Sequence, residues 1–196
     1  VCPCKKGMDT SDNDRFLRFW HEVNQEKFSF GLVEDEKKWY PYDKGGNFRR
    51  WYGNKEYVVN YEDNGAELQN SRANLRSKQL YFKEHITWSA LTAAGTSFRL
   101  SDYKSLFDSA GSSAFPNENI LSIMNTKVFD LIMGVINPTI NYGAGSVALT
   151  PIKQSDEALT PIKQSDEKDK IDRIASNNVE ISRTDWDAFE TSWDFK

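Results

Sequence analysis

Residues 57–61 read Tyr57-Val58-Val59-Asn60-Tyr61, and the turn-forming run Asp63-Asn64-Gly65 follows them. β-branched and aromatic residues are enriched in strands, and Asp-Asn-Gly is typical of a tight turn. We therefore predict a short strand that ends at a turn near Asp63. Two similar segments follow it, Ile86-Thr87-Trp88-Ser89 and Ser97-Phe98-Arg99-Leu100. Together these three segments predict the sheet part of a mixed fold.

Helical spacing appears on both sides of these strands. A helix is predicted from Glu118 to Ile136, with Asn117 as its cap and Asn137-Pro138 as its stop. The apolar residues expected on its core face recur at intervals of three and four: Ile120, Leu121, Met124, Val128, Leu131, Ile132 and Val135. Residues 70–84 resemble a solvated amphipathic helix, and residues 163–178 a charged surface helix. Residues 15–23 fit a helix or a strand, and residues 147–152 are expected to be extended.

These elements predict an α+β fold, a mixed globular lobe followed by a helical spacer. We place one domain at residues 1–150. Residues 151–196 then hold a linker, the spacer helix and an acidic tail rich in aromatic residues. Residues 148–157 (ALTPIKQSDE) are repeated without change at 158–167, which is too short for a solenoid repeat, and one copy is expected to be structurally redundant. The tail from Asp185 to Phe195 needs a surface on which to dock, and packing on its own chain is preferred.

Composition limits the class of protein. The chain has 196 residues, of which 38% are hydrophobic and 13% aromatic, enough for the core of one ordinary domain. No run approaches the roughly 18 apolar residues of a membrane span, and the start lacks the apolar region of a signal peptide. Because the chain begins with Val1 rather than Met, we interpret it as a fragment. We expect a cytoplasmic location.

Cysteine and histidine give no sign of a metal site or a disulfide framework. Cys2 and Cys4 are two residues apart, and His21 and His85 are isolated in the sequence. A structural zinc site needs about four such ligands at paired spacings. We therefore predict no metal site and interpret both histidines as structural or surface residues.

Positive charge is concentrated in the middle of an acidic chain. Residues 37–104 hold twelve Lys or Arg against seven Asp or Glu, whereas the other 128 residues hold thirteen against twenty-two. A basic island of this kind is typical of a surface that binds a polyanion, most often nucleic acid. The alternative is a core rich in aromatic residues with a solvated basic rim.

The sequence lacks the motifs of a self-contained enzyme. A methyltransferase acting on an exocyclic amine needs a glycine-rich donor loop after a strand, and an Asp/Asn/Ser-Pro-Pro-aromatic tetrapeptide whose ring stacks on the flipped base. The nearest string, Asn137-Pro138-Thr139-Ile140, lacks the second proline and the aromatic residue. Gly143-Ala144-Gly145 is a weak match to a donor loop, with no helical pattern after it. We therefore predict no catalytic residues and no cofactor site in this chain.

Several strings in a fixed order resemble the C-terminal part of the PglX-type adenine-specific DNA methyltransferases of BREX phage-defence systems. Fused type IIG restriction–modification enzymes are similar. The strings cover nearly the whole chain outside the repeated decapeptide: residues 7–16, 44–46 with 48–54, 86–89, 107–108 with 111–113, 125–129, 136–139 and 181–187.

The resemblance implies a target-recognition domain, similar to those of type I specificity subunits, with a helical spacer after it. It also implies that the donor loop and catalytic tetrapeptide lie N-terminal to Val1, in a methyltransferase domain that binds S-adenosylmethionine. The implied partners are double-stranded DNA, that methyltransferase domain and other phage-defence subunits.

A recognition domain holds phosphates and reads base edges in the major groove. The loop with Lys44, Gly45 and Gly46 suits a close approach to DNA, and we expect Arg49 or Arg50 to read a base. Four cations are the expected phosphate contacts: Lys44, Arg72, Lys78 and Lys83. Asp12 and Asn13 form a polar turn that either contacts bases or caps the segment after it. Thr87, Ser89 and Arg99 are expected to line one cleft. Trp51, Tyr52 and Trp88 are interpreted as core residues.

Two other functions compete with DNA recognition. The chain could instead be a protein-interaction domain that docks other phage-defence components through Asp185 to Phe195. A free-standing hydrolase is the third and least favoured hypothesis. Salt-dependent DNA affinity distinguishes the first function from the second.

Overall fold

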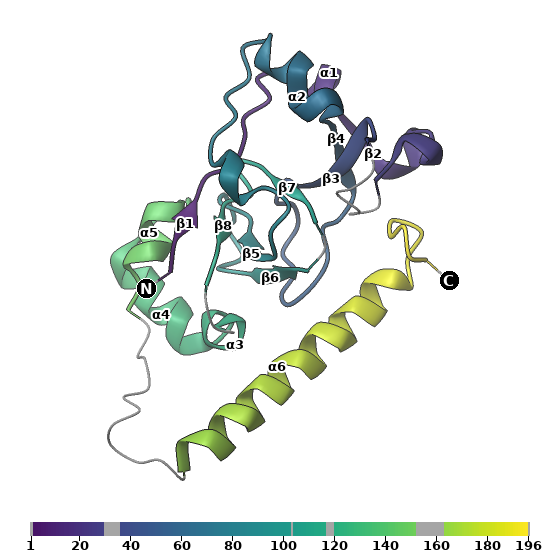
Figure 1. The fold of residues 1–196 in the computed structure, drawn as a ribbon. Helices are drawn as coiled ribbons and strands as arrows, with labels where there is room; N and C mark the ends of the chain where they lie inside the picture. The colour runs from purple at the N-terminus through teal and green to yellow at the C-terminus, as the bar shows by residue number, and fades with distance from the viewer. Residues whose placement is uncertain (1, 30–35, 103, 117–119, 152–162, 196) are drawn as a thin grey trace.

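A computed structural model of the chain describes residues 2–29, 36–102, 104–116, 120–151 and 163–195. They form an α+β fold with two small sheets and a long C-terminal helix (Figure 1). One sheet has the strand order β1-β8-β5-β6, from Cys4–Lys5, Ser113–Ala114, His85–Trp88 and Phe98–Ser101. The other has the order β2-β4-β3-β7, from Leu17–Phe19, Tyr57–Asn60, Trp39–Asp43 and Leu106–Phe107. The α+β prediction is confirmed.

The strands pair antiparallel in both sheets, with one exception. In the second sheet β3 pairs with β7 in parallel, through Tyr42 with Leu106 and Asp43 with Phe107. The three strands expected from the sequence are β4, β5 and β6, each within one residue of its predicted bounds. Apolar side chains on these strands are buried, which is why their local composition was informative.

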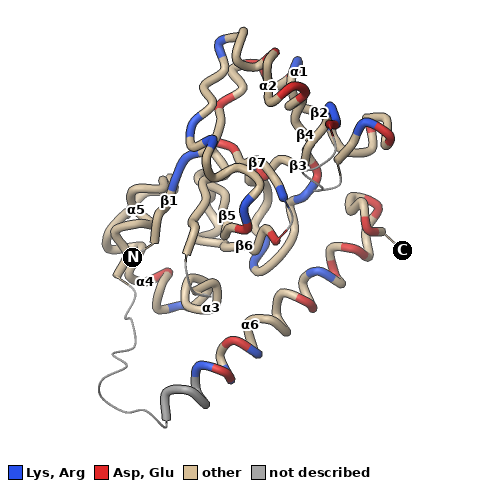
Figure 2. The backbone as a smooth tube through the Cα atoms, in the orientation of Figure 1, with Lys and Arg blue, Asp and Glu red and all other residues tan. Residues whose placement is uncertain are grey.

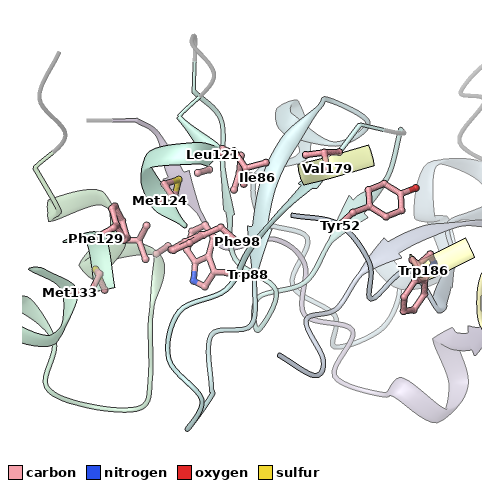
Figure 3. Close-up of a cluster of buried hydrophobic side chains, with 13 residues drawn as sticks. Tyr52, Ile86, Trp88, Phe98, Leu121, Met124, Phe129, Met133, Val179 and Trp186 are labelled. Carbon is pink, nitrogen blue, oxygen red and sulfur yellow. The ribbon is translucent and has the colours of Figure 1, made fainter. Parts of the chain in front are cut away.

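The first sheet carries one hydrophobic core together with the helices. Ile86, Trp88 and Phe98 pack there against α3 (Leu121–Met124) and α4 (Lys127–Ile136). Val147 of α5 (Ala144–Leu149) and two residues of α6 (Lys163–Asp187) complete this cluster (Figure 3). The two residues of α6 are Val179 and Trp186. The long helix is therefore part of the core as well as a projection from it.

The second sheet carries a separate core rich in tyrosine and phenylalanine. Tyr42, Val59 and Phe107 are buried there with Phe16 of α1 (Asn13–Phe16) and Leu68 of α2 (Glu62–Gln69). Short 3-10 turns lie on this side of the chain at Trp20–Glu22, Gln25–Lys27 and Lys78–Leu80.

Residues 15–23, which the sequence left undecided, divide among three elements. Residues 15–16 end α1, residues 17–19 form β2, and residues 20–22 form a 3-10 turn.

The predicted turn after β4 is present inside the residues assigned to α2. Asp63, Asn64 and Gly65 have left-handed φ values of 49°, 56° and 74°. A Cβ added to Gly65 would lie 2.7 Å from Cε2 of Tyr61, so glycine is required at this position.

Three secondary-structure predictions need correction. Residues 70–84 form turns with one 3-10 segment instead of an amphipathic helix. Residues 147–152 were expected to be extended, but residues 144–149 form α5. The single helix predicted at 118–136 is broken between Met124 and Lys127, where the hydroxyl of Thr126 accepts a hydrogen bond from the Phe129 N–H and caps α4. The predicted cap Asn117 and start Glu118 lie outside the described residues.

The core face expected for α4 was also wrong. Phe129 and Met133 are buried, whereas Val128, Leu131 and Val135 are 65%, 73% and 81% exposed. The helix has apolar residues on two sides, and packing against the first sheet selects the side with the larger aromatic and thioether groups. The predicted stop at Asn137-Pro138 is confirmed, because α4 ends at Ile136.

The C-terminal tail packs on its own chain, as preferred from the sequence. Trp193 stacks edge-on against Phe28 with ring centroids 5.6 Å apart. The indole N–H of Trp20 donates a hydrogen bond of 2.9 Å to the carbonyl of Thr191. The repeated decapeptide lies largely outside the described residues, so the expectation that one copy is redundant stays a prediction.

Candidate nucleic-acid interface

The loop between β3 and β4 contains the glycine and arginine residues selected from the sequence. Gly45 and Gly46 have φ values of 96° and 124°, which favour glycine. The hydroxyl of Ser89 donates a hydrogen bond of 2.8 Å to the carbonyl of Gly46 and ties the loop to the end of β5. The Lys44 ammonium lies 5.0 Å from the ring centroid of Tyr57. Gly46 is exposed, whereas Gly45 is buried.

Both arginines of this loop contact acidic residues on helices. Arg49 lies 3.1 Å from the Asp185 carboxylate and 5.0 Å from the Trp186 ring centroid, both on α6. Arg50 lies 2.7 Å from the Asp130 carboxylate on α4. Their side chains are about a third exposed, 32% and 30%. In this structure the pair joins the loop to the helices, and the expectation that one of them reads a base stays a prediction.

The three residues expected to line one cleft are buried instead. Thr87 and Ser89 are 3% and 6% exposed, and Arg99 is 1% exposed. The Thr87 hydroxyl donates to the Gly111 carbonyl at 3.4 Å, and Arg99 donates to the Arg49 carbonyl at 3.3 Å. Their polar atoms bond within the protein interior, so these three do not line an exposed cleft in this structure, and the DNA contact expected of them stays a prediction. The sequence predicted strands β5 and β6 correctly, but it did not predict that these polar residues are buried.

Two of the three aromatic residues that were interpreted as core residues are buried. Trp88 is 1% exposed, and its indole N–H donates to the Tyr142 carbonyl at 2.7 Å. Tyr52 is 5% exposed and Trp51 is half-buried. At the polar turn, the capping alternative is present. Asp12 accepts a hydrogen bond of 3.1 Å from the Arg15 N–H, and Asn13 accepts one of 2.6 Å from the Thr10 hydroxyl.

A group of exposed cations gathers where β1 meets the turns before β5 (Figure 2). The Ser77 hydroxyl donates a hydrogen bond of 3.0 Å to the Lys6 carbonyl, so the two segments lie side by side. An antiparallel bridge between Asp9 and Asn74 continues this contact. We call the five cations carried by these segments the basic patch: Lys5, Lys6, Arg76, Lys78 and Lys83.

Among the described residues, no ion pair engages a member of the basic patch. Arg72 is also exposed, and its carbonyl accepts a hydrogen bond from the Ser11 hydroxyl at 2.9 Å, so it lies farther along the same turns. The sequence selected Arg72, Lys78 and Lys83 but missed Lys5, Lys6 and Arg76. These three cations could not be identified from a local sequence pattern, because the patch depends on the contact between Lys6 and Ser77, which are 71 residues apart in the sequence.

A buried polar cluster joins the two sheets behind this surface. Asp43 of β3 lies 3.0 Å from Nε2 of His85 on β5, and both side chains are almost fully buried. The hydroxyls of Ser101 and Ser105 donate to the same Asp43 oxygen at 2.7 and 2.6 Å. Burial alone would raise the pKa of Asp43, but His85, Lys55 and Ser105 together hold this pKa well below its ordinary range. His85 is thus structural, as the sequence suggested.

A second buried charge fixes the long helix. The Lys55 ammonium lies 3.4 Å from Asp102, whose carboxylate also pairs with Arg183 of α6. Burial lowers the pKa of Lys55 to about 8, against the opposing effect of Asp102 and Asp43. The Lys55 side chain is 2% exposed, whereas those of Asp102 and Arg183 are 26% and 35% exposed. Asp102 therefore joins a buried lysine to α6 at the edge of solvent.

The chain shows neither a metal cluster nor a donor loop in the residues that the structure describes. No three His, Cys, Asp or Glu side chains come together there to hold a metal ion. Gly143-Ala144-Gly145 lies at the start of α5, where a helix was not expected, and Asn141 before it forms only an isolated bridge to Leu91. A donor loop follows a strand, so these residues do not fit S-adenosylmethionine. No helix within the described ranges is long and apolar enough to cross a membrane.

Comparison with known proteins gives two informative similarities. The chain is 39% identical over 198 aligned positions to the adenine-specific methyltransferase BrxX of Escherichia coli O9:H4 (strain HS), a match that covers 97% of this chain and 15% of that protein. It is 32% identical over 212 positions to the adenine-specific methyltransferase PglX of Lacticaseibacillus casei (strain Zhang), covering 100% of this chain and 17% of that protein. No protein-family model matches. The chain therefore spans about a sixth of the length of the curated relatives it matches.

Proposed function

Because the chain is homologous to one segment of the BrxX and PglX adenine-specific methyltransferases, we propose that it is the DNA target-recognition module of such an enzyme. In this proposal the parent protein methylates adenine N6 at a specific site, and S-adenosylmethionine binds in a separate catalytic domain. The role of this chain is to hold double-stranded DNA so that one adenine reaches that domain.

The basic patch is the observation that carries the proposal. A module that positions DNA has to neutralise phosphates, and Lys and Arg side chains without acidic partners can do so at little cost. Lys5 lies on a strand paired with β8, and Lys6 is tied to Ser77, so the backbone beneath the patch is fixed. Cations on a fixed backbone set the register of a duplex more precisely than cations on a loose tail.

The arginine loop then has a supporting role in the proposal. Arg49 and Arg50 fix the loop to α6 and α4, so the exposed residues Gly46 and Asn47 are held at a defined position. In this proposal, side chains at the edge of this loop or of the basic patch read the bases. Lys44 is half-buried with its ammonium over the Tyr57 ring, and it stays a predicted phosphate contact.

The proposal is tested by fluorescence anisotropy with random-sequence duplex DNA at about 50 and 200 mM salt. The test variant removes four charges of the basic patch, Lys5→Gln, Lys6→Gln, Arg76→Gln and Lys78→Gln. The control removes four exposed cations elsewhere, Lys27→Gln, Lys127→Gln, Lys168→Gln and Lys170→Gln. Because each lost phosphate contact lowers the slope of log K against log salt by about 1, the test variant should lose up to about 4 units of slope.

Two results would contradict the proposal. Equal affinity of the test and control variants would remove the basic patch from DNA binding. Absence of any binding at low salt, with both proteins folded by circular dichroism, would count against a DNA-recognition role for this chain.

The alternative function, docking of other phage-defence components, retains one observation in its favour. Its original contact, the tail from Asp185 to Phe195, packs on the chain itself through Trp193 and Thr191. The exposed aliphatic side of α4 remains without a cover in the described structure. A chain whose only partner is a protein would show no salt-dependent affinity for DNA, so the same titration separates the two functions.

A further inference from the structure

We propose that Cys2 and Cys4 form a reactive dithiol that a small-molecule disulfide, such as glutathione disulfide, converts reversibly to an intramolecular Cys2–Cys4 disulfide. The two sulfur atoms are 3.8 Å apart, within hydrogen-bonding distance of each other. Both cysteines are free and half-buried, so a small reagent can reach them while neighbouring groups hold them in place.

The surroundings hold the two sulfurs together. Cys4 lies in β1 opposite Ala114, and the Phe115 N–H donates a hydrogen bond of 3.0 Å to the carbonyl of Pro3 between the two cysteines. Both side chains pack at the margin of the hydrophobic core beneath the first sheet. The close approach of the sulfurs is therefore set by strand pairing and packing.

The pair is asymmetric, which assigns a separate role to each thiol. The hydrogen bond with Cys4 lowers the pKa of the Cys2 thiol to about 7, while the same hydrogen bond and burial raise the pKa of Cys4. A thiolate is the attacking form in disulfide exchange, and a thiol whose pKa is near the ambient pH attacks fastest. Cys2 is thus the nucleophile, and Cys4 is the resolving thiol.

The exchange proceeds in two balanced steps. The Cys2 thiolate attacks one sulfur of glutathione disulfide, an S–S bond forms to Cys2, and one glutathione thiolate leaves. Cys4 then loses its proton to solvent and attacks Cys2 Sγ, which forms the Cys2–Cys4 bond and releases the second glutathione thiolate. Two protein thiols are oxidised and one small disulfide is reduced to two thiols.

Geometry predicts that the disulfide forms under strain and is easily reduced. Residues two apart in an extended strand have Cα atoms about 6.6 Å apart, near the upper limit for a disulfide. Because Cys2 precedes β1, closure can move Cys2 while Cys4 stays paired with Ala114. Strained disulfides have more oxidising potentials than structural ones, so excess dithiothreitol should reopen this bond completely.

The two sulfurs alone are a poor site for a metal ion. A structural zinc site needs about four protein ligands, and the described residues place no third His, Cys, Asp or Glu beside these two sulfurs. Oxidation needs only the two thiols that are present.

In the test, the reduced chain is incubated with mixtures of glutathione and glutathione disulfide at about pH 7.5. Free thiols are then alkylated with N-ethylmaleimide, and the mass of the intact chain is measured by mass spectrometry. The expected product lacks two hydrogen atoms, carries no maleimide and returns to the reduced mass with dithiothreitol. The Cys4→Ser variant should stop at a single mixed disulfide on Cys2. The Cys2→Ser variant should form its mixed disulfide more than about tenfold more slowly, because burial raises the pKa of the remaining thiol.

A further variant tests the hydrogen bond itself. Serine at position 4 can still donate to the Cys2 thiolate, whereas Cys4→Ala cannot, so the rate at Cys2 should shift to higher pH only in the alanine variant. The proposal is overturned if the wild-type chain keeps two alkylatable thiols or two glutathione adducts at every ratio. Equal rates for Cys4→Ser and Cys2→Ser would also overturn it.

Discussion

Trp186 is the residue through which we expect the long helix to contribute most to stability. It lies near the end of α6 and is 3% exposed in the core beneath the first sheet. Its ring packs against the backbone at Gly53, where an added Cβ would lie 3.1 Å from Cε3 of the indole. The Arg49 guanidinium covers the ring at 5.0 Å from its centroid.

Replacing Trp186 with Ala should lower the free energy of unfolding by about 4 kcal/mol. Truncation of a buried aromatic side chain to alanine typically costs about 3–5 kcal/mol, because the transfer free energy is lost and a cavity remains. The lost cation–π contact adds roughly 0.5–1 kcal/mol, since Arg49 is partly exposed. This is a large share of the roughly 5–15 kcal/mol that keeps a domain folded.

Equilibrium unfolding in urea, followed by circular dichroism, measures this change. Phe189→Ala is the matched control, because Phe189 lies three residues further along the chain and is 50% exposed. We expect the control to change the free energy of unfolding by less than about 0.5 kcal/mol. If Trp186→Ala cost no more than the control, docking of α6 through this ring would be wrong.

Four further outcomes are expected. Gly7→Ala should prevent folding or cost several kcal/mol in urea titrations, because an added Cβ would lie 1.8 Å from the Phe107 carbonyl oxygen; Gly134→Ala, where nothing lies within 4 Å, is the tolerated control. Met133→Glu should unfold the chain whereas Val135→Glu should leave its melting temperature nearly unchanged, because Met133 is buried and Val135 is 81% exposed; equal melting temperatures would refute the observed face of α4. Asp43 has a lowered pKa in the folded chain, so its stabilising contribution is present above its ordinary pKa of 3.8 and is lost as pH falls through the folded value. Asp43→Asn should lower the free energy of unfolding by about 3–5 kcal/mol at neutral pH and weaken its dependence on pH in acid. Lys55 has a pKa of about 8 in the folded chain against 10.5 in the unfolded chain, so the unfolded chain binds more protons between pH 8 and 10.5 and the free energy of unfolding should rise with pH there. Urea titrations at a series of pH values should show this rise in the wild type and not in Lys55→Met.

Local composition was sufficient to predict β4, β5 and β6, but it did not predict the other strands of the two sheets. Tyr57-Val58-Val59-Asn60 is bounded by a turn that requires left-handed backbone, so neighbouring residues alone specify it. The same holds for the Asn137-Pro138 stop, which acts through proline sterics on the preceding residue. The tail also behaved as its aromatic content suggested, because Trp193 and Trp186 both find apolar partners.

Residues that act through distant contacts were not predictable in this way. Arg49 and Arg50 look like ligand-binding arginines in the sequence, but their carboxylate partners lie 136 and 80 residues away. Val128 and Phe129 are both apolar neighbours on a helix, and only the position of the first sheet determines which one is buried. The basic patch needed β1 beside residues 76–83, a pairing that no local pattern encodes.

The contact between Trp20 and Thr191 has a consequence for how the chain is made. A ribosome releases the N-terminal sheet residues long before the C-terminal tail, and domains form only as their parts emerge. Until Trp186 and Thr191 leave the exit tunnel, the backbone at Gly53 and the indole N–H of Trp20 lack their native partners. Because contacts between such distant residues form slowly, completion of this fold is expected to be a late event that follows the emergence of residues 186–191.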